Sequence, residues 1–155
     1  MIRKLLLLAA IIQSGAGSLV IAQQIAQSFD NPLDVAFGDP YVIYDDATER
    51  YYMYGTGGGA RNGFAAYSST DLVNWKNEGQ IYHAANANGW SDSTAAWGGA
   101  YWAPEVYAYN GKFYLFYSAQ WRENPDNEEE NFRIGVAVAN KPTGPFIDVQ
   151  DRPIF

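Results

Sequence analysis

The chain has 155 residues, a net charge of −7 and no cysteine. The length allows one domain with a real core, and the acidic balance excludes a nucleic-acid partner, whose backbone attracts clusters of Lys and Arg. The lack of cysteine excludes disulfides, thiolate metal sites and a lipoprotein anchor. Aromatic residues make up 16% of the chain, which suits a neutral, hydroxyl-rich ligand, because rings stack on sugar faces and carboxylates accept hydrogen bonds from hydroxyls.

Residues 1–22 have the pattern of a secretory signal peptide. A positively charged start, with Arg3 and Lys4, precedes an apolar stretch and a small-residue cleavage pattern. A membrane anchor is the alternative, but polar residues and glycines interrupt the apolar run, and a spanning helix needs about 20 apolar residues. We expect cleavage, a secreted or periplasmic bacterial location without membrane attachment, and a linker over residues 23–36.

Two segments of the chain repeat one pattern of strands. Residues 38–56 read GDPYVIYDDATERYYMYGT, and residues 101–118 read YWAPEVYAYNGKFYLFYS. The Asn-Gly dipeptide at 110–111 is a strong hairpin signal, because both residues of such a turn need φ > 0. Aligning Pro40 with Pro104 gives a repeat of 64 residues. Two further apolar runs follow each copy, so the repeating unit is four short strands.

Four short strands in series, repeated along the chain, are typical of the blades of a β-propeller. We predict an all-β fold in which residues 37–155 form part of a propeller, with blade one at about 38–82 and blade two at about 101–150. Asp39 lies one residue before its proline, and Glu105 lies one residue after. Because this offset of two is even, we expect both side chains to face the central channel.

Other motifs favour structural roles. The glycine-rich stretch 55–60 leads into another strand-like run and not into the helix that a dinucleotide site needs, so we expect a hairpin loop. His83 is the only histidine, which excludes a zinc site built on several histidines. The acidic run 126–130 lacks the ligand spacing and the glycine of a calcium loop. We therefore expect a solvated loop there and assign no metal site.

Asp39 and Glu105 are the strongest candidates for catalysis. Acids at strand ends are most often surface residues, but we expect these two to share a position in the repeat, and each is flanked by aromatic residues. Two carboxyl groups facing one pocket are what glycoside hydrolysis needs, because one protonates the leaving oxygen and the other activates water.

The residues around these acids resemble family 43 of the glycoside hydrolases. The resemblance rests on FGDPYVIYDD, SSTDLVNW, WAPEVYAYNGKFYLFYS and ANKPTGPF. It implies a five-bladed β-propeller, of which this chain supplies about the first two blades, and inverting hydrolysis of arabinose- or xylose-containing plant polysaccharides. It also implies that Asp39 is the general base, that Glu105 modulates the pKa of the general acid, and that Trp97 and Trp102 stack on the sugar. Many members have Asp at the place of Glu105.

The chain departs from the family pattern in one respect. The family's general acid is a Glu of a later blade, so the resemblance implies a fragment that ends before this residue and is inactive as it stands. The expected partner is a carbohydrate; no cofactor is required, and a structural calcium ion in the channel is left open by the resemblance. The alternative is a non-catalytic sugar-binding propeller, in which the acids only accept hydrogen bonds from hydroxyls.

Overall fold

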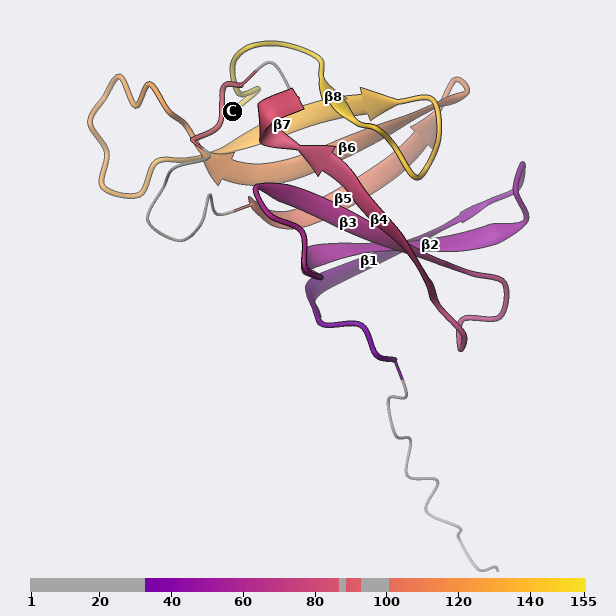
Figure 1. Cartoon of the computed structure of the whole chain (residues 1–155). Coiled ribbons are helices and arrows are strands. Elements are labelled where there is room, and N and C mark those ends of the chain that lie inside the picture. The colour runs from indigo at the N-terminus through magenta and orange to yellow at the C-terminus, as the bar shows by residue number, and fades with distance from the viewer. Residues whose placement is uncertain (1–32, 87–88, 93–100) are drawn as a thin grey trace, which may run out of the picture. The chain divides into compact units, whose positions relative to one another are not determined.

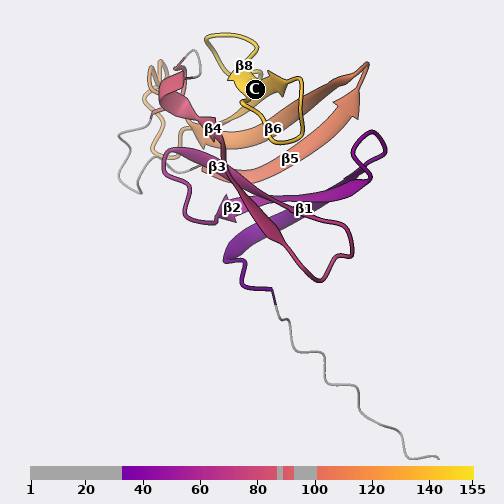
Figure 2. The same cartoon turned by 45° about the vertical axis from the view of Figure 1, so that its right-hand side comes forward.

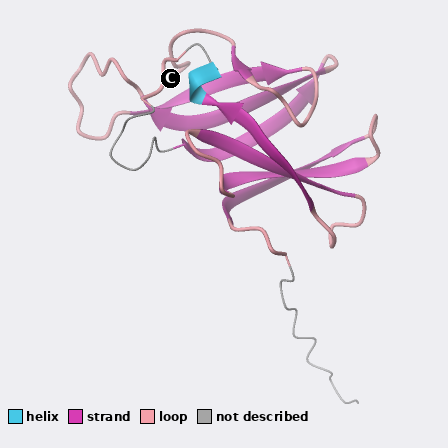
Figure 3. Cartoon of the chain, in the orientation of Figure 1, coloured by secondary structure: helices cyan, strands magenta, loops and turns pink. Residues whose placement is uncertain are grey.

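The computed structural model describes residues 33–86, 89–92 and 101–155. The expected signal peptide, most of the expected linker and Trp97 lie outside these ranges. Eight strands and one short 3₁₀ turn, η1 (Ala84–Asn86), make up the regular structure of the described chain (Figures 1 and 3). The strands form two four-stranded sheets, each in the order of the sequence, which confirms the predicted all-β class. Within these ranges no helix is long and apolar enough to cross a membrane.

The first sheet is an antiparallel meander in which each strand pairs with its neighbours in the sequence. The glycine-rich stretch joins its second and third strands, and positive φ angles at Gly57, Gly58 and Gly59 turn the chain there. Glycine adopts such angles without steric cost, so the stretch leads into a strand, as expected, and not into a helix. The strands are β1 (Phe37–Asp45), β2 (Arg50–Gly57), β3 (Gly63–Ser69) and β4 (Lys76–His83).

The second sheet repeats the same meander. Asn110 and Gly111 form its first turn with φ of +48° and +71°, which is the conformation that the Asn-Gly dipeptide predicts. The last strand has only two residues, so it is the least regular part of the sheet. The strands are β5 (Tyr101–Tyr109), β6 (Lys112–Gln120), β7 (Phe132–Ala139) and β8 (Ile147–Asp148).

The two sheets share one hydrophobic core. Strand β5 lies against β1 and β2, as both views show (Figures 1 and 2). The Tyr54 hydroxyl, which is fully buried, donates a hydrogen bond of 2.9 Å to the Pro142 carbonyl, and the Phe146 amide donates one of 2.8 Å to the Ile81 carbonyl. The largest fully buried apolar side chains come from both sheets and are mostly aromatic: Tyr54, Tyr82, Tyr117, Phe64 and Phe146.

A polar cluster lies inside this aromatic core and joins the sheets. Tyr117 donates a hydrogen bond of 2.6 Å to Asp148 Oδ1, and Tyr82, from the first sheet, lies 2.7 Å from the Tyr117 hydroxyl and 3.2 Å from Asp148 Oδ2. Burial raises the pKa of the Asp148 carboxyl, although the two tyrosine hydrogen bonds act in the opposite direction. Because buried polar groups are costly unless they are hydrogen-bonded, the two hydroxyls make this carboxyl tolerable in the core.

The face of the second sheet that points away from the first sheet is also apolar. The side chains of β7 and β8 alternate between the two faces, and Ile134, Ile147 and Val149, which directly follows β8, stand on the outer one. Each is between 38% and 47% exposed. The second sheet is thus apolar on both faces, as is typical of an element that packs between two others.

Candidate functional site

A small open pocket lies where the first strands of the two sheets meet. It has a volume of about 300 Å³ and is lined by three residues of β1 and three of β5. Both acids that the sequence singled out, Asp39 and Glu105, belong to this lining and are exposed. The fold therefore brings these two carboxyl groups to one place. The full lining is Asp39, Pro40, Tyr41, Ala103, Pro104 and Glu105.

Each of the two strands carries a bulge at this pocket. In β1, Gly38 and Tyr41 are three residues apart but pair with β2 residues that are only two apart. In β5 the same irregularity lies between Trp102 and Glu105. A proline lies inside each bulge, where the ladder needs no donor, because proline has no N–H to give. The bulges match when the two prolines are aligned, which confirms the repeat.

The bulges also correct the reason we expected the two acids to converge. Simple alternation along a strand does not hold across an extra residue, so the even offset does not itself decide where the side chains point. In the paired registers Glu105 corresponds to Tyr41, and Asp39 corresponds to Ala103. The two acids thus occupy different positions of the repeat and reach one pocket because the bulges re-aim them.

The two carboxylates have different hydrogen-bond partners. Thr56 on β2 donates a hydrogen bond of 2.8 Å to Asp39 Oδ2. Tyr107 donates one of 2.6 Å to Glu105 Oε2, and this bond is the main reason why the pKa of Tyr107 is raised. The Tyr107 ring also packs against Tyr41, with 5.6 Å between the ring centres. Each acid is therefore held by a hydroxyl, one from the neighbouring strand and one from its own.

Sequence reasoning did not single out Tyr107 or Thr56. Tyr107 could have been found, because it lies two residues after Glu105, and residues two apart share a face of a strand. Thr56 could not, since its contact depends on the register between β1 and β2. Of the two tryptophans expected to stack on sugar, Trp102 is 46% exposed on β5, next to the pocket lining but not part of it. Trp97 lies outside the described residues.

The remaining candidates stay outside the pocket. His83 ends β4, and its Nδ1 accepts a hydrogen bond from the Ala85 amide. The acidic run lies in the loop between β6 and β7, where Glu128 pairs with Arg133. Among the described residues no group of three or more His, Cys, Asp and Glu could hold a metal ion. The calcium ion that the resemblance left open stays a prediction.

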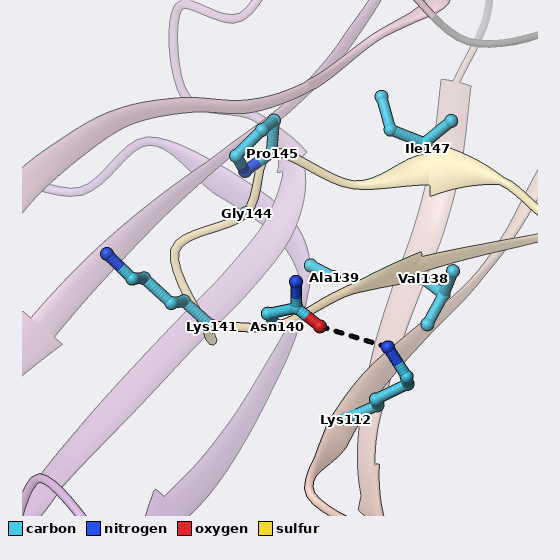
Figure 4. A pocket seen from close by; sticks show the side chains of 8 residues that line it. All are labelled: Lys112, Val138, Ala139, Asn140, Lys141, Gly144, Pro145 and Ile147. Carbon is cyan, nitrogen blue, oxygen red and sulfur yellow. Dashed lines mark hydrogen bonds between the residues drawn. The ribbon is translucent and has the colours of Figure 1, made fainter.

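A larger hollow, of about 470 Å³, lies around the start of β6 and the loop between β7 and β8 (Figure 4). Lys112 Nζ donates a hydrogen bond of 3.0 Å to Asn140 Oδ1 at its edge. This lining contains two ammonium groups and no carboxylate, so it lacks the groups for acid–base hydrolysis. Its residues are Lys112, Val138, Ala139, Asn140, Lys141, Gly144, Pro145 and Ile147.

Comparison with known proteins gives one consistent family. The profile of Glycosyl hydrolases family 43 matches residues 29–154. The arabinoxylan arabinofuranohydrolase of Bacillus subtilis (strain 168) is 33% identical over an aligned length of 160 residues. The alignment covers 90% of this chain and 29% of that protein. The extracellular endo-α-(1→5)-L-arabinanase 1 of the same organism is 32% identical over 80 residues, which cover 52% of this chain and 24% of that protein.

Solved structures agree with the sequence relatives. The crystal structure of a thermostable family-43 glycoside hydrolase matches with a TM-score of 0.64 and 35% identity. The match covers 83% of this chain and 37% of that one. The chain thus spans well under half the length of each of these relatives.

Proposed function

Because this chain belongs to family 43 of the glycosyl hydrolases, we propose that it supplies part of the active site for inverting hydrolysis of O-glycosidic bonds in arabinose- or xylose-containing plant polysaccharides. The observation that supports this most is the pocket lined by both Asp39 and Glu105. Glycoside hydrolysis uses carboxyl groups that flank the scissile bond. The names of the relatives, an arabinofuranohydrolase and an arabinanase, support the class of sugar.

In the proposed reaction Asp39 is the general base. Its carboxylate accepts a proton from a water molecule, and the water oxygen attacks the anomeric carbon while the bond from that carbon to the leaving oxygen breaks. The leaving oxygen takes its proton from a general acid, and the configuration at the anomeric carbon inverts. Glu105 is the one other acid in the described lining. We assign the general acid to a carboxyl group outside the described residues.

Glu105 acts on that general acid in this scheme. A carboxylate near an acid disfavours a second negative charge, so it raises the pKa of the acid and keeps it protonated. The hydrogen bond from Tyr107 orients Glu105 for this role. Trp102 offers an exposed ring on the same strand for stacking on a sugar face, and Trp97 is assigned the same role from the sequence resemblance.

Sugar binding without hydrolysis is the second candidate. It is favoured by the described lining, which contains two carboxylates that can accept hydrogen bonds from sugar hydroxyls and no third acid. The two candidates differ at Asp39. Turnover requires a group there that accepts a proton, whereas binding requires only a hydrogen-bond acceptor, which an amide oxygen also provides.

The test is the hydrolysis of dinitrophenyl xyloside and dinitrophenyl arabinofuranoside by the full enzyme, because the chain by itself is expected to be inactive. An activated phenol leaves without being protonated, so this assay needs the base and not the general acid. Asp39→Asn is expected to lower kcat by roughly 10²- to 10⁴-fold, the usual value of general-base assistance, while sugar binding persists. Asp45→Asn is the matched control, because Asp45 ends the same strand and also accepts a hydrogen bond from a threonine, Thr48.

The stereochemistry is read by NMR from the first sugar formed. Release of α-xylose from a β-xyloside supports inversion, and release of β-xylose contradicts it. Equal kcat values for the unmodified chain and Asp39→Asn would show that Asp39 is not the base. Binding of xylo-oligosaccharides without turnover in any variant would favour the sugar-binding role.

A further inference from the structure

The Thr56 side chain forms a bridge between the two sheets at the pocket. Its Oγ1 donates a hydrogen bond of 2.8 Å to Asp39 Oδ2 and accepts one of 2.8 Å from the Ala103 amide. Ala103 is the residue before Pro104 and Glu105, so it begins the segment that carries the second carboxylate. One hydroxyl therefore contacts both halves of the pocket.

The direction of the two hydrogen bonds follows from their chemistry. A main-chain N–H can only donate, so the Thr56 oxygen must accept from Ala103. The single hydroxyl proton is then left for Asp39, whose carboxylate can only accept when it is ionised. Because Oδ2 accepts the Thr56 proton, Oδ1 is the carboxylate oxygen that we assign to accept a proton from water.

We propose that Thr56 is a positioning residue: it orients the Asp39 carboxylate and holds it in register with the bulge of β5, and so with Glu105. The proposal rests on the assignment of Asp39 as general base. A base must lie within hydrogen-bond reach of the water that it activates, and a misplacement of about 1 Å can cost roughly 10²-fold in rate. A hydroxyl fixed to the neighbouring sheet gives Asp39 this constraint.

The repeat shows that this bridge is specific to one copy. In the second sheet Ser118 pairs with Trp102, as Thr56 pairs with Gly38 in the first. The second sheet thus keeps a hydroxyl at this position but has Ala103 in place of the acid. The hydroxyl and the carboxylate occur together only where the general base is proposed.

The same hairpin contains a matched pair for comparison. Thr48 donates a hydrogen bond of 2.7 Å to Asp45 Oδ2 and accepts one of 3.0 Å from the Tyr52 hydroxyl. Like Thr56, it donates one hydrogen bond to an aspartate and accepts one, here from a hydroxyl, but at the opposite end of the hairpin between β1 and β2. A threonine-to-valine change at Thr48 removes as many hydrogen bonds without touching the pocket.

The experiment compares Thr56→Val, Thr56→Ser and Thr48→Val in the full enzyme with the dinitrophenyl glycosides. Thr56→Val keeps the side-chain shape and is expected to lower kcat by about 10- to 100-fold with KM little changed, because the base is misplaced and sugar binding is not. Thr56→Ser keeps the hydroxyl and should restore most of the rate. Thr48→Val should keep the unmodified kcat although it unfolds at a similarly lowered temperature.

Two outcomes overturn the proposal: an unchanged kcat in Thr56→Val, or an equal loss of kcat in Thr48→Val. If the unmodified full enzyme does not hydrolyse these substrates, the proposed function fails separately. Thr56 is then tested by NMR couplings that report χ1 of Asp39. One rotamer in the unmodified chain and in Thr56→Ser, but averaging in Thr56→Val, supports positioning, and identical couplings in all three overturn it.

Discussion

Asp39 and Ala103 adopt the same backbone conformation in the two sheets, each with φ of +47° and each directly before a proline. A positive φ is uncommon for residues other than glycine, and especially for one without a side chain that can hydrogen-bond locally. Such conformations concentrate at ligand sites, and both residues line the same pocket. The pocket is thus built by one backbone feature that occurs twice, while the acids sit at two different places in it.

Replacing Glu105 by Gln should shift the pH dependence of the full enzyme to lower pH on natural, unactivated substrates. The change removes a negative charge, so protons leave neighbouring acids more easily and their pKa values fall. The basic limb of the pH profile of kcat, which reports loss of the protonated general acid, should shift furthest to lower pH. Tyr107→Phe keeps the charge of Glu105 and removes only the hydrogen bond to Oε2, so both limbs of the pH profile of this variant should stay at the same pH. Unchanged limbs in Glu105→Gln would make Glu105 a sugar-binding residue only.

Replacing Trp102 by Ala should weaken binding more than it slows chemistry. An exposed indole ring that stacks on a sugar contributes to the bound state and the transition state alike, so KM rises while kcat changes little. By analogy with stacking on aromatic rings, a loss of about 1 kcal/mol, or roughly 5-fold in affinity, is expected. Tyr109→Ala is the control, because Tyr109 ends the same strand and is 66% exposed. Equal effects of the two changes on xylo-oligosaccharide affinity would argue against stacking at Trp102.

The buried Asp148 should make the protein less stable as the pH rises. Burial raises the pKa of this carboxyl above its unfolded value, and hydrogen bonds from Tyr117 and Tyr82 offset this only in part. The folded state therefore binds more protons than the unfolded state, so stability falls with pH in the window from about 3.9, the ordinary value for Asp, up to the raised pKa. The free energy of unfolding, measured with urea across this window, should fall as the pH rises. Asp148→Asn should remove the part of this slope that Asp148 causes. Asp126→Asn, in the exposed loop between β6 and β7, should leave the slope unchanged.

Replacing Gly135 by Ala should destabilise the fold without touching the pocket. A Cβ atom there would overlap the Trp90 ring and lie 2.6 Å from Tyr117 Cζ, and both rings are buried. Overpacking of this kind typically costs about 1–3 kcal/mol. At Gly38 an added Cβ meets only Thr56, at 3.7 Å from its Cβ and 3.9 Å from its carbonyl oxygen, so Gly38→Ala is the matched control. Thermal unfolding should show a fall of several degrees for Gly135→Ala alone, and equal melting temperatures would contradict the packing account.

Much of the fold could be predicted because its signals are local. The Asn110-Gly111 turn and the alternation of apolar residues each act over a few neighbouring positions. Because the pattern is repeated, the strand order predicted for one four-stranded unit also applies to the other. The contacts of Asp148 could not be predicted, because a two-residue strand gives no periodic pattern and its partners come from distant strands.

The sequence by itself determined the all-β class, the two four-stranded units and the two acids at the site, because strand periodicity, turn chemistry and repetition are written in adjacent residues. Only the tertiary structure decided how these acids meet. An extra residue in a strand reverses the alternation of side chains, and the contacts of Asp39 with Thr56, and of Thr56 with Ala103, depend on strand register and on the packing of one sheet against the next. Residues 47 positions apart along the chain meet there, and no local pattern encodes that distance.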